Sequence, residues 1–109
     1  MNTDLVILGA GAAGLFAACA AADSGLKGLL LERRHRAGLK LLMCGNNRCN
    51  LSHDGTAEDL LHAYGSPIRD FLAPAIRAFP PDELRRWFQH RLGLKTKLLG
   101  KRIYPASEK

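Results

Sequence analysis

Residues 5–14 read LVILGAGAAG, and this stretch decides the fold of the chain. Its first four residues are all apolar, which is typical of a short strand buried on both faces of a parallel sheet. The three glycines that follow have the spacing G-x-G-x-x-G. In that pattern Gly9 allows a tight turn, Gly11 lets a phosphate approach the backbone, and Gly14 lets a helix pack closely on the strand. The stretch therefore predicts a strand, a dinucleotide-binding turn and the start of a helix.

The residues that follow complete a βαβ unit over about residues 4–32. Residues 12–24 are rich in alanine and stop at a glycine, as a helix does, while residues 28–32 read GLLLE, a second buried strand that ends in an acid. The first turn of the helix offers unpaired N–H groups to phosphates. Glu32 stands where a carboxylate accepts hydrogen bonds from ribose hydroxyls, and a carboxylate there disfavours the 2′-phosphate of NADP.

A second segment, residues 38–53, reads GLKLLMCGNNRCNLSH. It resembles a family of FAD-dependent flavoproteins that includes aminoacetone-oxidase-like and bile-acid-reductase-like enzymes, with the pattern G-x-K-L-L-x-[ST]-G-x-G-R-C-N-x-[ST]-N. The end of the chain, residues 100–109, is similar to the same family's stretch G-R-x-[FY]-P-x-S-x-K-A, with Lys101 as one extra residue. The first segment departs from the pattern at Cys44, Asn47 and His53.

The resemblance implies an α/β fold, a doubly wound, Rossmann-like FAD-binding domain of which this chain is the N-terminal and incomplete part. It implies flavin hydride transfer by the intact protein, and it places residues 38–53 beside the flavin and the pyrophosphate. For Arg48 a salt bridge within the loop, and for Asn50 an Asx-type turn, are equally good interpretations. No catalytic residue is identified. The predicted cofactor-binding residues are Gly9, Gly11, Ala12, Ala13, Gly14, Glu32, Arg33, Lys40, Gly45, Arg48, Cys49 and Asn50.

Two other functions stay open from the sequence alone. Cys44 and Cys49 have the C-x₄-C spacing of the redox dithiol in flavin disulfide reductases. Their flanking residues do not match those enzymes, so we expect Cys49 to pack in the loop instead. The second alternative is a nucleotide-binding module without turnover, which a flavin absorption band after purification would separate from an oxidoreductase.

Residues 66–109 predict helices followed by a hairpin. Ser66 is expected to cap a helix whose first position is Pro67, with apolar residues at helical spacing after it. Pro74 is expected to kink or divide that helix. The other elements expected are a helix opened by residues 80–83 and stopped at Gly93, and a hairpin of residues 95–99 with residues 102–104.

The 109 residues contain 16 Lys and Arg against 10 Asp and Glu, a net charge of +6. That length suits one domain and excludes a two-domain enzyme contained in this sequence. No apolar run reaches the roughly 20 residues of a membrane span. Three cysteines, an odd number, favour a reduced, cytoplasmic setting.

The positive charge is concentrated in residues 85–109, but no nucleic-acid motif accompanies it and aromatic residues are only 6% of the chain. We therefore expect this stretch to be a solvated face, with neither nucleic acid nor membrane as partner. The four histidines have no metal-ligand spacing with the cysteines, so no metal is expected. The expected partners are a small-molecule substrate and, in the intact protein, NAD(P)H.

Overall fold

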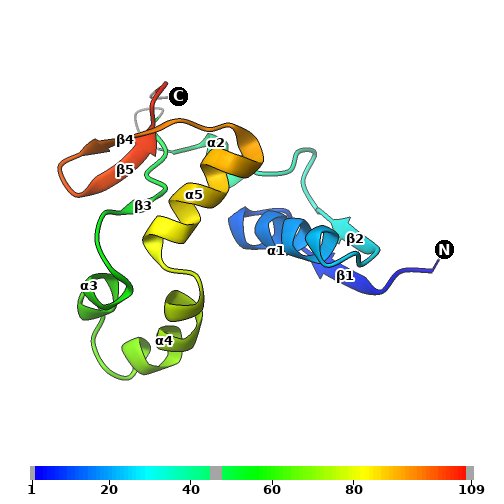
Figure 1. The fold of residues 1–109 in the computed structure, drawn as a ribbon. Helices are drawn as coiled ribbons and strands as arrows, with labels where there is room; N and C mark the ends of the chain where they lie inside the picture. The colour runs from blue at the N-terminus through cyan, green and yellow to red at the C-terminus, as the bar shows by residue number, and fades with distance from the viewer. Residues whose placement is uncertain (1, 45–47, 108–109) are drawn as a thin grey trace. The chain divides into compact units, whose positions relative to one another are not determined.

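The computed structural model describes residues 2–44 and 48–107, and the chain divides into two compact units, residues 1–47 and residues 48–109. The first unit contains the predicted βαβ arrangement and one further short helix (Figure 1). Its elements are β1 (Leu5–Leu8), α1 (Ala12–Asp23), β2 (Gly28–Leu31) and α2 (Leu39–Leu42).

The two strands of the first unit form a parallel sheet. Leu5 pairs with Gly28 at one end of the sheet, and Leu8 pairs with Leu31 at the other. Helix α1 connects the strands and packs against both of them, so it covers one face of the sheet (Figure 1). The strands and the crossover helix lie where the sequence predicts them, and the fold is α/β.

The glycine turn brings α1 unusually close to β1. A β-carbon built on Gly14 would lie 1.9 Å from the carbonyl oxygen of Gly9 and 3.4 Å from the Ile7 side chain. Only a glycine fits at this helix position, because any side chain would overlap the backbone of the turn. The close packing of helix on strand predicted for Gly14 is therefore present.

The described residues of the second unit, 48–107, form three helices and a small antiparallel sheet with the strand order β3-β5-β4 (Figure 1). The predicted hairpin is confirmed, since β4 pairs with β5 from Thr96 opposite Pro105 to Leu99 opposite Arg102. The strand β3 and the helix α3 were not foreseen. The elements are β3 (Ser52–His53), α3 (Ala57–His62), α4 (Ile68–Ala78), α5 (Pro81–Leu92), β4 (Thr96–Leu99) and β5 (Arg102–Pro105).

One prediction for α4 is wrong. Ser66 does not cap the helix: the N-cap is Pro67, the helix begins at Ile68, and no side chain bonds to its free N–H groups. Of the two effects expected from Pro74, a kink or a division, the division is absent, because one helix runs from Ile68 to Ala78 through it. Proline removes one backbone hydrogen bond, and the packing of α4 against α3 supports the remaining turns. The predictions for α5 hold, because it runs from Pro81 to Leu92 and Gly93 caps its end with φ +63°.

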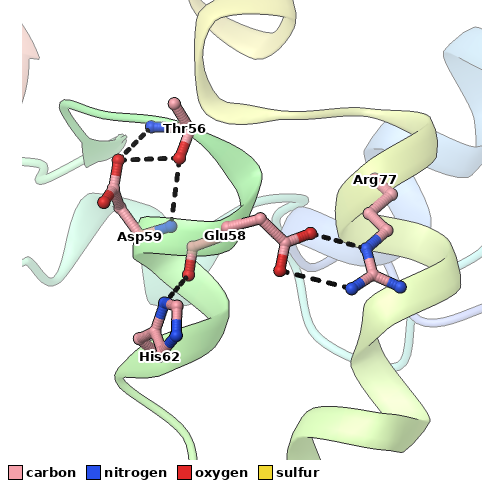
Figure 2. A network of polar contacts seen from close by, with 5 residues as sticks. All are labelled: Thr56, Glu58, Asp59, His62 and Arg77. Atoms are coloured by element: carbon pink, nitrogen blue, oxygen red, sulfur yellow. Dashed lines mark hydrogen bonds and ion pairs between the residues drawn. The ribbon is translucent and has the colours of Figure 1, made fainter.

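A polar network joins α3 to α4 (Figure 2). The Thr56 hydroxyl accepts from the N–H of Asp59 at 3.1 Å, and the Asp59 carboxylate accepts from the N–H of Thr56 at 2.8 Å, which is a capping box. Glu58 of α3 accepts two hydrogen bonds from the Arg77 guanidinium of α4, at 2.7 and 3.2 Å. Leu61, on the same helix, is 1% exposed. The pair of helices therefore combines an apolar contact with a bidentate ion pair at its surface.

Candidate nucleotide-binding site

The backbone conformation of Gly9 and a hydrogen bond to β2 shape the glycine turn. Gly9 adopts φ +97°, which favours glycine, and its N–H donates to the carbonyl of Leu31 at 2.7 Å. Gly11 is the N-cap of α1, and a β-carbon there would meet no atom within 4 Å. The space in front of Gly11 is therefore open to a ligand, in contrast to the space in front of Gly14.

Glu32, directly after β2, is fixed across this turn by hydrogen bonds to both of its carboxylate oxygens. Oε2 accepts from the N–H of Ala10 at 2.7 Å, and Oε1 accepts from the N–H of Arg34 at 2.8 Å. The backbone N–H groups of Arg34 and Ala10 lower the pKa of the Glu32 carboxyl below its ordinary value of 4.5. Each carboxylate oxygen keeps a lone pair, so the side chain is charged, oriented and able to accept from hydroxyl groups.

The loop after Glu32 returns to the same turn. The N–H of Gly38 donates to the carbonyl of Ala10 at 2.7 Å, and Gly38 takes φ +68° as the N-cap of α2. Ala10 is 2% exposed, and it is bonded through its N–H to Glu32 and through its carbonyl to Gly38. This pair of bonds closes residues 33–37 into a loop and holds Lys40, on α2, beside the turn.

A cavity of about 430 Å³ lies between the turn, the loop and α2. One carboxylate and three cationic side chains line it, so it suits a ligand that carries both hydroxyl groups and negative charge. Of the residues predicted from the sequence, Gly11, Glu32 and Lys40 line the cavity, whereas Arg33 is not among its lining residues. The full lining is Ala10, Gly11, Glu32, Arg34, Arg36, Leu39, Lys40 and Met43.

The geometry agrees with the comparison to known families. The model of the family described as the HI0933-like protein Rossmann domain matches residues 3–109. The chain belongs to the HI0933-like family. It is a family of FAD-binding Rossmann proteins, and the resemblance identified from residues 38–53 and 100–109 is therefore confirmed.

Two curated relatives of this HI0933-like chain are enzymes. The chain is 36% identical over 104 residues to the 3-dehydro-bile acid delta(4,6)-reductase of Clostridium scindens. The aligned region covers 94% of this chain and 24% of that protein. It is 42% identical over 50 residues to the ribosomal RNA dihydrouridine synthase of Escherichia coli. This second aligned region covers 46% of this chain and 12% of that protein. The chain thus spans about a quarter of the length of the first relative.

The remaining predicted site residues of this HI0933-like chain are distributed over both units. Ala12 and Ala13 form the first turn of α1 and are exposed. Gly45 lies outside the described residues. Arg48, Cys49 and Asn50 belong to the second unit, and their contact with the cofactor stays a prediction.

Asn50 has a local structural role in the second unit. With its amide oriented to suit its neighbours, its nitrogen donates to the carbonyl of Ser52 at 2.8 Å and to that of Ile103 at 3.3 Å. The amide therefore ties the start of β3 to β5. This is not the Asx turn predicted from the sequence, in which the side-chain oxygen accepts from a backbone N–H, because here the side-chain nitrogen donates to two carbonyls.

Sequence reasoning missed several parts of the cavity. Ala10 lies between two motif glycines and acts through its backbone alone, so its side chain gives no signal. Arg36 carries no motif, and the bond from Gly38 to Ala10 joins the end of its loop to the turn. The described residues contain no group of three His, Cys, Asp or Glu side chains arranged to hold a metal, and no helix among them is long and apolar enough to cross a membrane.

Proposed function

We propose that this chain is the N-terminal part of a longer FAD-dependent oxidoreductase and that it supplies the adenosine and pyrophosphate side of the FAD site. One observation carries the proposal. The Glu32 carboxylate is held by the N–H of Ala10 next to the open start of α1 at Gly11, in a chain of a flavoprotein family. The lengths of the curated relatives support a longer parent protein.

The residues present fit the adenosine and pyrophosphate half of FAD. Gly11 leaves room for the pyrophosphate, and the first-turn N–H groups of α1, including those of Ala12 and Ala13, face outward from the helix start. Glu32 is charged and aimed to accept hydrogen bonds from ribose hydroxyls. Lys40 lies at the same cavity and opposes the negative charge of the phosphates.

In this proposal, bound FAD supplies hydride transfer at its flavin N5, and the protein supplies position and electrostatics. Glu32 disfavours a 2′-phosphate at its cavity, so any NADPH that donates electrons binds elsewhere in the intact protein. The bile acid relative is named as a reductase, which supports redox chemistry. We place the protein in the cytoplasm, where a small-molecule substrate and NAD(P)H are available to it.

The test is a substitution at the point of pyrophosphate approach. Gly11→Val places a branched side chain where the cavity is open, so the intact protein is expected to lose its flavin absorption band on purification. Gly28→Val is the matched control, because Gly28 also has no neighbouring atom within 4 Å but lies in β2 and not in the cavity lining. Unchanged flavin occupancy in Gly11→Val would place the site elsewhere.

A further inference from the structure

The two faces of the small sheet in the second unit differ in burial along β5: Ile103 and Pro105 are buried, whereas Arg102 is exposed and Tyr104 is half-buried. Ile103 of β5 is 2% exposed, and Pro105 two residues later is also buried. Thr96, which pairs with Pro105, accepts a hydrogen bond from Arg85 Nε of α5 at 2.7 Å. Side chains alternate along a strand, so the residues between these positions belong to the opposite face.

That opposite face, which we call the basic face, gathers cations around an aromatic ring. Cross-strand pairing sets Lys97 opposite Tyr104, and Arg102 opposite both Leu99 and His53. Residues paired in this way share a face of an antiparallel sheet. The basic face therefore consists of His53, Lys97, Leu99, Arg102 and Tyr104.

Two more lysines border the basic face. The N–H of Ala106 donates to the carbonyl of Lys95 at 2.8 Å, so the hairpin pairing continues to Lys95, which shares its alternation with Lys97. Lys101 occupies the turn between β4 and β5, and its carbonyl accepts from the N–H of Asp54 at 2.9 Å. The three strands themselves contain no acidic residue.

We propose that the basic face binds single-stranded nucleic acid, with Lys95, Lys97, Lys101 and Arg102 at the phosphates and the Tyr104 ring as a stacking platform. A sheet surface that combines cations with an aromatic side chain matches what a single strand offers, a charged backbone and unpaired bases. A membrane is a poorer partner, because Leu99 is the one large apolar side chain of the five and is only 40% exposed.

The structure changes the interpretation of the basic stretch in residues 85–109. In the sequence, the cations are spread along the chain without a motif, which favours a solvated face. In the fold, Arg86 forms ion pairs with Asp82 and Glu83 of its own helix. Arg85 donates a hydrogen bond to the Thr96 hydroxyl, on the face of the sheet that carries Ile103. The cations of the hairpin are thereby separated from those of α5 and concentrated on one surface.

The first experiment measures binding of a fluorescent oligouridylate of about 12 nucleotides to the purified chain by anisotropy, over a range of salt concentrations. Four phosphate contacts predict that the logarithm of the association constant falls against the logarithm of salt with a slope of about −2.8. The double variant Lys97→Ala with Arg102→Ala is expected to reduce that slope by about 1.4. Lys27→Ala is the matched control, since it removes an exposed cation of the first unit and is expected to change nothing.

A second set of variants separates stacking from charge and from folding. Tyr104→Ala is expected to weaken binding about tenfold without changing the salt slope, whereas Tyr104→Phe, which keeps the ring, retains the affinity. Lys95→Ala, at the residue just before β4, changes no side chain of the three strands and is expected to lower the slope by about 0.7. The circular dichroism of each variant is compared with that of the parent chain.

Further measurements identify the type of single strand that binds, and several results would overturn the proposal. Comparison with an oligodeoxythymidylate of equal length distinguishes RNA from DNA as the single strand. Absence of binding, unchanged binding in the double variant, or tighter binding to a duplex or to anionic lipid vesicles would each overturn the proposal. Because Gly11→Val acts on the first unit alone, it is expected to leave oligonucleotide binding intact. Failure of the FAD proposal is therefore distinguishable from failure of this one.

Discussion

At the scale of single residues, the glycine motif was predictable and the cavity around it was predictable only in part. The strand, the turn and Glu32 follow from spacing because each glycine meets a local steric demand. The contributions of Ala10 and Arg36 depend on two long-range hydrogen bonds, from the N–H of Ala10 to the Glu32 carboxylate and from the N–H of Gly38 to the carbonyl of Ala10. No pattern in the sequence encodes those bonds.

The two glycines Gly11 and Gly14 give opposite predictions for the same substitution. Gly14→Ala places a methyl group 1.9 Å from the Gly9 carbonyl oxygen, so the helix must shift and the free energy of unfolding should fall by about 1–3 kcal/mol. Gly11→Ala meets no atom within 4 Å and keeps φ −80°, so stability should be retained. Urea denaturation of both variants checks this, and equal stability losses would contradict the close approach at Gly14.

Glu32 makes a pH-dependent contribution whose sign follows from its lowered pKa. Because the folded state favours the carboxylate, the stabilisation is fully present above about pH 4.5 and is lost as the pH falls through the folded pKa. The difference in stability between the parent chain and Glu32→Gln should therefore be constant between about pH 6 and 8 and shrink below the ordinary pKa. A difference that grows on acidification would contradict the hydrogen bonds from Ala10 and Arg34.

The cysteines allow a test of the dithiol alternative. Cys44 is half-buried at the end of the described part of the first unit, and Cys49 is half-buried in the second unit. If neither is a redox centre, Cys44→Ser should leave flavin reduction in the intact protein largely unchanged, because serine is what the family pattern allows there. Rapid-kinetic absorbance at the flavin band measures this. Loss of turnover, together with a charge-transfer band in the parent, would favour the dithiol.

At the scale of elements, the sequence predicted those elements whose signals are local. The alanine-rich composition of α1, the glycine after α5 and the turn of the β4–β5 hairpin were sufficient. Helix α3 was missed because it has only six residues, too few to show a period. Strand β3 was missed because two residues, Ser52 and His53, form it only by pairing with β5.

The side-chain cap at the start of α3 is expected to stabilise the folded chain, and the uncapped start of α4 provides the control for its removal. Thr56→Ala removes the hydroxyl that accepts from the N–H of Asp59, so the chain should lose about 1 kcal/mol of stability. Ser66→Ala should change little, because no side chain caps α4. Thermal unfolding followed by circular dichroism compares the two. Equal losses would mean that the cap of α3 has no special role.

At the scale of the whole molecule, the parallel sheet of the first unit leaves apolar surface without cover. The face opposite α1 carries Val6, 50% exposed, Leu8, 80% exposed, and Leu31, 47% exposed. Both strands are also edge strands, because β1 pairs only with β2 among the described residues. Uncovered apolar side chains beside open strand edges favour association between chains.

We therefore expect the isolated 109-residue chain to self-associate, to bind FAD weakly at best and to have no oxidoreductase activity of its own. Sedimentation velocity with added FAD measures the first two properties together. Leu8→Gln should shift the distribution toward monomer if the sheet face drives association, because it replaces the most exposed apolar side chain of that face. Phe71→Gln, at a side chain 84% exposed on α4, tests the second unit in the same way and should have the smaller effect. The open strand edges explain this difference, since α4 satisfies its own backbone whereas β1 and β2 do not. A monodisperse monomer with stoichiometric, tightly held flavin would show instead that these 109 residues form a complete small flavoprotein.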